Sequence, residues 1–305
     1  PKPQNPGRVQ SFNFIMISKR ATFLIETDEL AAAITEGKSL KIIDGSWFPD
    51  QDAAALFLES RVTKDTVHFD IKTIVEPGSD LIFRFPSQDV FATHMKALDI
   101  QKNHSIVVYD QSPAGLFTAA RVAYMLRHYG VADVKLLNGG MKKWKAEGRT
   151  VVSGPVENAP TEQAGGDYGF AAADASKVVM DIGVMHDYAG KLFKAEDAKQ
   201  LDFQVLDARD AGGFGSASIK NSVNVPHTDL IAEDGTIKSD AEIKAVFDAA
   251  GVDTGKQSVC SCGGGVTACV VELGLLVLGN ENKTSLYDGS WQEYAKVEQP
   301  DFTKM

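Results

Sequence analysis

The sequence predicts an α/β fold built from two tandem units, each a parallel sheet with helices on both faces. Three observations support this prediction. Short apolar runs rich in β-branched residues alternate with amphipathic, helix-like runs along the 305 residues, which is the pattern of parallel strands joined by helices. The same order of runs occurs twice, and a stretch rich in proline and glycine separates the two occurrences.

The predicted strands of the two units correspond in order. The matching runs are residues 40–44 with 203–207, 105–110 with 257–262, and 134–140 with 284–290. The first pair ends in aspartate in both units, and in the second pair Asp110 stands at the position of Cys262. Trp144 likewise falls on Tyr294. Because the spacing between partners drifts, the repeat indicates insertions in loops rather than a solenoid, whose period is about 20–50 residues.

Helix and linker signals divide the chain. Helix-like runs at 116–128 and 241–250 are each followed by a glycine that ends the helix. Residues 151–173 contain Pro155, Pro160 and several glycines without periodicity, which is typical of a linker. The predicted parts are an N-terminal extension (1–20), an N-terminal domain (21–150), the linker (151–173) and a C-terminal domain (174–305).

The composition excludes several classes of function. A formal charge of -10 without clustered Lys and Arg argues against a nucleic-acid partner. No apolar stretch reaches the roughly 18 residues of a membrane span. Three cysteines, two of them Cys260 and Cys262, give neither a disulfide framework nor the spacing of a zinc site, so we expect a reducing compartment and no metal. The basic, acid-free residues 1–20 weakly resemble an organellar presequence, so the expected compartment is cytoplasmic or mitochondrial.

A cysteine between a strand and a helix carries the chemistry. The connection consists of six residues, Cys262, Gly263, Gly264, Gly265, Val266 and Thr267. Backbone N–H groups and the positive end of the helix dipole make such a connection an anion cradle. The anion expected here is the Cys262 thiolate, which would act as a nucleophile. Phosphatase or arsenate-reductase chemistry would need an Arg in the loop, and there is none from 262 to 269.

Three motifs together resemble the tandem-domain rhodanese family. They are Cys-Gly-Gly-Gly-Val-Thr-Ala at 262–268, Leu-Tyr-Asp-Gly-Ser-Trp at 286–291 and Asp-Gly-Ser-Trp at 44–47, and the resemblance covers about residues 23–294. It implies two rhodanese-like domains, of which the first, with Asp110, is catalytically silent. Within the family, the enzymes that use 3-mercaptopyruvate carry small residues in the cysteine loop, and Gly263 and Gly264 resemble these. The enzymes that use thiosulfate usually carry basic residues there.

The resemblance implies a sulfurtransferase without a cofactor. Cys262 would take sulfur from 3-mercaptopyruvate, a small-molecule donor, form a persulfide and release pyruvate. The acceptor would be a thiol such as thioredoxin or glutathione, or cyanide. Two alternatives remain open: thiosulfate as the main donor, and a persulfide carrier or binding module without turnover.

The chain departs from the family pattern around the expected pocket. Gly213 stands where the family usually has a substrate-binding Arg, Val62 where it commonly has a relay His, and Gly264 in place of a relay Ser. Arg61, Lys72 and Arg84 are candidates for a replacement cation. Losing a bidentate Arg is expected to weaken the grip on a carboxylate.

Four further residues are candidates for the pocket. His227 stands where the family usually has an aromatic residue. It either approaches Cys262 and tunes its thiolate or protonates the leaving group, or it only replaces an aromatic side chain in the pocket wall. Arg209 either pairs with Asp207 or Asp210 or contacts substrate. Trp47 and Phe117 match cleft-lining positions and could equally be core residues. Cys260, two residues before Cys262, is either a resolving thiol or an inert buried one.

Overall fold

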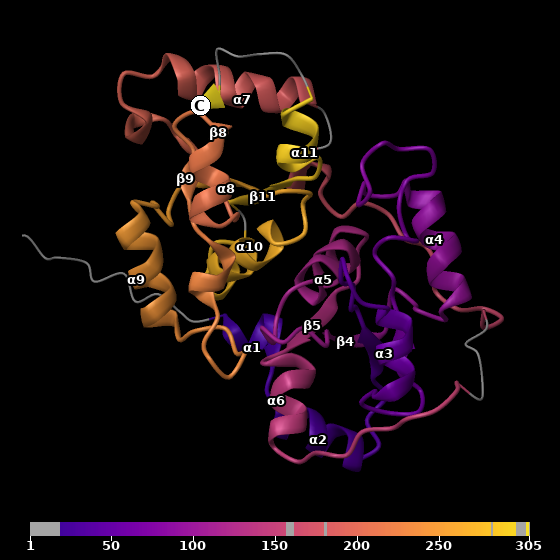
Figure 1. The fold of residues 1–305 in the computed structure, drawn as a ribbon. Coiled ribbons are helices and arrows are strands. Elements are labelled where there is room, and N and C mark those ends of the chain that lie inside the picture. The colour runs from indigo at the N-terminus through magenta and orange to yellow at the C-terminus, as the bar shows by residue number, and fades with distance from the viewer. Residues whose placement is uncertain (1–18, 157–161, 180–181, 282, 297–302, 305) are drawn as a thin grey trace, which may run out of the picture.

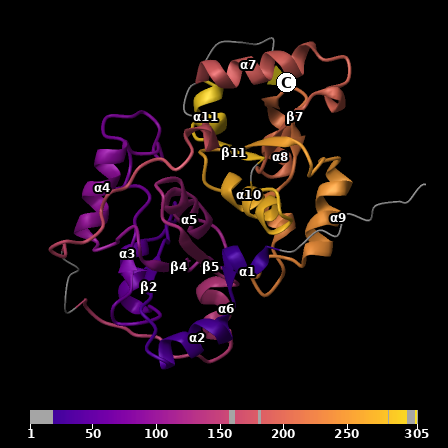
Figure 2. The same ribbon diagram turned by 180° about the vertical axis from the view of Figure 1, so that it is seen from behind.

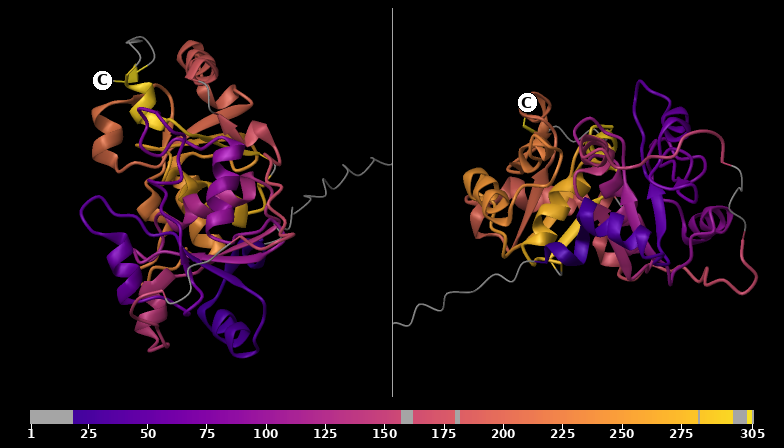
Figure 3. Two further views of the ribbon diagram at one scale, coloured as in Figure 1. Left: turned by 90° about the vertical axis from the view of Figure 1, so that its right-hand side faces the viewer. Right: turned by 90° about the horizontal axis from the view of Figure 1, so that it is seen from below.

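The chain folds around two five-stranded parallel sheets (Figure 1). The structure is a computed structural model that describes residues 19–156, 162–179, 182–281, 283–296 and 303–304. The predicted extension, 1–20, therefore lies almost wholly outside the described residues. Figure 2, from behind, and Figure 3, from the side and below, show the two sheets in separate lobes that meet along one seam.

The two sheets have the same strand order. The N-terminal strands are β1 (Leu24–Ile25), β2 (Lys41–Asp44), β3 (Val67–His68), β4 (Ser105–Tyr109) and β5 (Asp133–Leu137), in the order β1-β5-β4-β2-β3. The C-terminal strands are β6 (Val178–Val179), β7 (Phe203–Asp207), β9 (Val223–Asn224), β10 (Gln257–Ser261) and β11 (Thr284–Tyr287), in the order β6-β11-β10-β7-β9. This equivalence confirms the predicted fold class and the repeat. A separate antiparallel pair joins β8 (Ser218–Ile219) to β12 (Thr303–Lys304).

Helices cover both sheets. Those of the N-terminal half are α1 (Arg20–Phe23), α2 (Thr27–Thr35), α3 (Ala53–Glu59), α4 (Gln88–Ala97), α5 (Ala119–His128) and α6 (Gly140–Ala146). Those of the C-terminal half are α7 (Ile182–Lys194), α8 (Ala211–Ser216), α9 (Asp240–Ala250), α10 (Ala268–Val277) and α11 (Ser290–Tyr294), with short 3₁₀ turns η1 (Ala175–Lys177), η2 (Ala198–Gln200) and η3 (His227–Leu230). None of the helices in the described part of the chain has the length and apolar character needed to cross a membrane.

The seam between the lobes is built on α5 and α10, which pack against each other. Every residue of α10 is buried, because this helix is covered by its own sheet on one side and by α5 on the other. One continuous hydrophobic core contains residues of both sheets, such as Val108 of β4 and Leu206 of β7. Burial from both sides explains why α10 is apolar on every face apart from Glu272. The lobes therefore form a single packed body.

The chain also crosses the seam at its N-terminal side. Lys19 N donates to Val277 O at 3.0 Å, and the Arg20 guanidinium reaches Lys238 O and Asp240 on the C-terminal lobe. The predicted linker packs on the N-terminal lobe, where Arg61 pairs with Val152 in an isolated antiparallel bridge. The limits of the two domains, 21–150 and 174–305, remain a prediction.

Candidate active site

Cys262 lies at the carboxyl end of β10, in the centre of its sheet, and is 2% exposed. Its N–H donates to Ser290 Oγ at 3.0 Å, and its carbonyl accepts from Trp291 N at 2.9 Å. Ser290 has a φ of 50°, in the left-handed region, and its partner in the repeat, Gly140, has a φ of 55°. A non-glycine residue in that region carries strain that its surroundings must offset. This strained turn therefore anchors the start of the cysteine loop.

Two glycines of the loop lie close to neighbouring groups, Gly265 to the turn after β11 and Gly264 to the Phe83 ring of the N-terminal lobe. Gly265 has a φ of 77°, and a Cβ on it would lie 2.5 Å from Asp288 O, so a side chain has no room there. A Cβ on Gly264 would lie 3.3 Å from the ring of Phe83, whereas one on Gly263 would meet nothing within 4 Å. Within the described part of the chain, the backbone N–H groups from Gly263 to Thr267 have no acceptor. They are free to stabilise a negative charge.

Asp110 shows what the equivalent connection binds in the N-terminal lobe. β2 and β7 pair with β4 and β10 in the same register, so Asp110 and Cys262 each directly follow the central strand. The buried Asp110 carboxylate accepts three backbone N–H groups, from Ser112 at 3.0 Å, Phe117 at 2.8 Å and Ala119 at 2.8 Å. Burial raises the pKa of Asp110 to about 6, although these N–H groups act in the opposite direction. At neutral pH this connection therefore holds an anion.

A buried arginine from the N-terminal lobe holds the cysteine loop. Arg121 of α5 is fully buried and donates to Gly265 O at 3.1 Å, to Phe83 O at 2.6 Å and to Asp288 Oδ1 at 2.5 Å. Its guanidinium lies 4.1 Å from the centre of the Phe85 ring. Asp288 also accepts from Phe85 N at 3.0 Å. A planar guanidinium suits several acceptors at once, and here it fixes the loop relative to both lobes.

Aromatic side chains from both lobes face each other near the loop. Trp47 and Phe83 form an edge-to-face pair with ring centroids 4.8 Å apart, and Phe83 is the ring beside Gly264. Phe117 lies 6.2 Å from the ring of His227 across the seam. His227 Nδ1 lies 3.2 Å from Ala208 O, and burial lowers its pKa. At neutral pH His227 is therefore uncharged.

Comparison with known proteins identifies the family. A family model of the rhodanese-like domain matches residues 26–147 and 188–297, once in each lobe. The chain belongs to the rhodanese family. The match confirms the resemblance seen in the sequence, and each matched segment contains the central strand and the loop that follows it.

Relatives of this rhodanese carry two names. The thiosulfate sulfurtransferase of Bos taurus is 32% identical over 288 residues, covering 89% of this chain and 91% of the bovine one. The 3-mercaptopyruvate sulfurtransferase of Homo sapiens is also 32% identical over 288 residues, covering 90% and 91%. SseA from Escherichia coli, whose crystal structure describes the rhodanese fold of 3-mercaptopyruvate sulfotransferases, is 30% identical with a TM-score of 0.74, covering 88% of this chain and 99% of SseA. The chain is thus a sulfurtransferase, and its relatives leave the donor open.

The guanidinium groups of Arg209 and Arg61 form hydrogen bonds with other groups of the protein. Arg209 Nη2 donates to Asp207 at 2.6 Å and to Ala217 O at 2.9 Å, and its guanidinium lies 4.7 Å from the Trp291 ring. Arg61 donates to the linker carbonyl of Gly154 at 2.7 Å. These contacts fit the structural alternative for Arg209. They give Arg61 a role in holding the linker.

The other positions singled out in the sequence form contacts within the protein or lie in its core. Arg84 pairs with Glu293 at 3.2 Å and lies 3.6 Å from Asp288. Gly213 is part of α8, where its N–H donates to Asp210 at 2.8 Å, and Val62 is buried in the core. Cys260 is fully buried, and burial raises the pKa of its thiol, which fits an inert role.

Sequence reasoning missed Arg121 and the anchoring role of Ser290. A signal for Arg121 existed, because it is the one charged residue in the otherwise apolar stretch 119–126. An arginine within an apolar stretch of a helix is costly to bury without partners. The sequence does not reveal which partners it finds.

Proposed function

We propose that this rhodanese is a 3-mercaptopyruvate sulfurtransferase that acts through a Cys262 persulfide. The observation that supports it most is the equivalence of Cys262 and Asp110. One lobe holds a carboxylate on the backbone N–H groups of its loop, and the other has a thiol at the same place with N–H groups that have no acceptor in the described chain. Such a loop stabilises a thiolate and a persulfide anion by the same donors.

Two displacements at sulfur complete the reaction. The Cys262 thiolate attacks the sulfur of 3-mercaptopyruvate, an S–S bond forms, and the C–S bond breaks with its electron pair moving to carbon. The resulting pyruvate enolate takes up a proton and leaves as pyruvate. The thiolate of an acceptor, such as thioredoxin or glutathione, or cyanide then attacks the outer sulfur and restores the Cys262 thiolate. We place the reaction in the cytoplasm or the mitochondrion.

The uncharged loop favours this donor. Gly263 and Gly264 add no cation beside Cys262, and Phe83 closes in on Gly264, so the surroundings suit a small keto acid better than a dianion. Thiosulfate is the second candidate, because relatives of that name are equally similar and Gly213 leaves out the family's carboxylate clamp.

Steady-state kinetics with both donors test the proposal. We expect kcat/KM for 3-mercaptopyruvate to exceed that for thiosulfate by at least about tenfold, which corresponds to about 1.4 kcal/mol. Mass spectrometry after donor alone should show one added sulfur atom on Cys262. A higher kcat/KM with thiosulfate would reverse the order of donors. Persulfide formation without turnover with any acceptor would indicate a carrier.

We propose that His227 assists the leaving group rather than only forming a wall. Replacing it in His227→Phe keeps an aromatic ring opposite Phe117 but removes the imidazole, so kcat should fall by roughly a hundredfold. Because burial lowers its pKa, His227 gains its proton only below about pH 6.5, so the wild-type rate should rise as the pH falls below this value, and the variant should lose that rise. His94→Phe, on the outer helix α4, is the control. An unchanged rate and pH profile in His227→Phe would mean that His227 only forms part of the pocket wall.

A further inference from the structure

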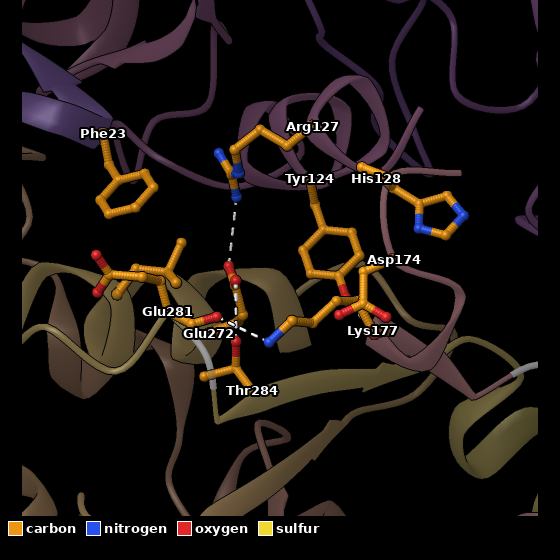
Figure 4. A pocket seen from close by; sticks show the side chains of 11 residues that line it. Phe23, Tyr124, Arg127, His128, Asp174, Lys177, Glu272, Glu281 and Thr284 are labelled. Carbon is orange, nitrogen blue, oxygen red and sulfur yellow. Dashed lines mark hydrogen bonds and ion pairs between the residues drawn. The ribbon is translucent and has the colours of Figure 1, made fainter. Parts of the chain in front are cut away.

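A second pocket lies in the seam, against the later part of α10, whereas Cys262 precedes this helix. Its volume is about 230 Å³, and its walls come from α1, α5, η1, α10 and the segment leading to β11. Figure 4 shows Phe23, Tyr124, Arg127 and Glu272 around it. Small-molecule sites commonly span about 300–1,000 Å³. This pocket therefore suits a ligand smaller than a drug or a nucleotide.

The pocket contains a cation with unused hydrogen-bonding capacity. Arg127 Nη2 lies 3.4 Å from Glu272 Oε2, a long contact, and the guanidinium lies 5.5 Å from the Phe23 ring. Arg127 Nη1 is buried and has no partner among the residues that the structure describes. Leaving a buried donor unpaired costs roughly 1–3 kcal/mol. An acceptor that enters the pocket would remove this cost.

A second cation, Lys177, also lines the pocket beside Glu272. Lys177 Nζ donates to Glu281 O at 2.8 Å, and an ammonium group has two further N–H donors. Figure 4 shows the Lys177 side chain extending toward Glu272 from the side opposite Arg127. The remaining walls are largely apolar, formed by Phe23, Tyr124 and Leu276. The pocket thus combines two cations with a hydrocarbon lining.

We propose that this pocket binds a small monocarboxylate with an apolar body, the carboxylate on Arg127 and Lys177 and the body against Phe23, Tyr124 and Leu276. A single negative charge fits because acidic groups also line the pocket, Asp174, Glu272 and Glu281, and these would repel a phosphate dianion. The proposal needs no chemistry at Cys262 and extends beyond the sulfurtransferase reaction.

Glu272 makes the binding depend on pH. Its carboxyl is buried and accepts from Thr284 Oγ1 at 3.4 Å, and burial raises its pKa to about 7, although Arg127 and Lys177 act in the opposite direction. The other titratable groups that act on it or line the pocket with it are Tyr124 and His128 on α5, Cys260 on β10, Cys269 on α10, Asp174 and Glu281. A protonated Glu272 does not repel a bound anion. Affinity should therefore be highest below pH 7 and fall as the pH rises.

Isothermal titration of the full chain with benzoate tests the proposal, with benzamide as the uncharged analogue. We expect benzoate to bind with a Kd on the order of millimolar, as suits nine heavy atoms, and benzamide at least tenfold more weakly. Benzoate should also raise the unfolding temperature, because the pocket joins both lobes. Raising the pH from 6 to 8 should weaken binding by up to roughly tenfold, and Glu272→Gln should remove that dependence.

Matched variants locate the binding. Arg127→Met keeps the aliphatic stem and should lose at least tenfold in affinity, as should Lys177→Met, which is the second variant if the first fails to fold. Arg149→Met, at an arginine paired with Glu147 and Asp28 away from the pocket, should bind normally. Cys262→Ser should also bind normally, whatever its effect on turnover. Equal affinity in wild type, Arg127→Met and Lys177→Met, or loss of binding in Cys262→Ser, would overturn the proposal.

Discussion

Cys262→Ser should lose sulfurtransferase turnover by at least about a thousandfold with either donor. A serine hydroxyl is not ionised at neutral pH and is a poor nucleophile toward sulfur, so neither displacement can begin. The same variant should gain no sulfur atom when it is incubated with 3-mercaptopyruvate. Initial rates of pyruvate release and intact-mass spectrometry measure the two effects.

The control for this prediction is Cys260→Ala. Cys260 lies in the same strand, but it is fully buried and burial raises the pKa of its thiol, so its loss should leave the rate within a few-fold of wild type. Turnover that survives in Cys262→Ser would refute the persulfide mechanism. Abolished turnover in a folded Cys260→Ala would mean that the second thiol takes part in the reaction.

Much of the fold could be predicted because the strands of one unit have counterparts in the other. β4 is an apolar run after Ser105, as expected for a strand buried on both faces, whereas β10, with the sequence Gln-Ser-Val-Cys-Ser, is predicted by its match to β4 in the repeat. The helix that the sequence predicts directly after the cysteine loop is α10, at Ala268–Val277. In contrast, β6 and β9 contain two residues each. So short a strand has no periodicity of its own and exists only because a neighbour pairs with it.

The sequence predicts the catalytic loop but not the residues that hold it in place. Cys262 and its glycines are adjacent in sequence, so six consecutive residues are enough to indicate their chemistry. The partners of Arg121 are far away, since Gly265 and Asp288 lie 144 and 167 residues along the chain. Only the docking of α5 on α10 brings them together. Long-range contacts of this kind follow from tertiary packing and leave no local pattern.

The side chains near Cys262 could likewise be predicted only in part from the sequence. The family pattern indicates His227, Phe117 and Trp47, and the structure brings the first two rings to 6.2 Å from each other across the seam. Trp47 pairs with Phe83, which the sequence did not single out. Apolar residues occupy both core and site, so an aromatic residue alone does not reveal which of the two it serves.

Arg121→Met should destabilise the folded chain by about 3 kcal/mol, because the buried Asp288 carboxylate loses the shorter of its two ion pairs and keeps only Arg84, 3.6 Å away. It also removes the donor to Gly265 O and Phe83 O, so the folded fraction should have a lower kcat with both donors. Urea unfolding measures the first effect and steady-state kinetics the second. Arg149→Met, at an arginine with exposed partners, should change the unfolding free energy by less than about 1 kcal/mol.

Two further variants separate charge from geometry in this prediction. Arg121→Lys keeps a positive charge for Asp288 but lacks the planar fork that serves two carbonyls as well, so it should recover stability more than kcat. Arg121→Met combined with Asp288→Leu removes both charges and should be more stable than Arg121→Met alone, since no unpaired charge stays buried. If the double variant were no more stable than the single one, the cost would come from lost packing. If Arg121→Lys restored kcat completely, the carbonyl contacts would not position the loop, and Arg121 would act through its charge.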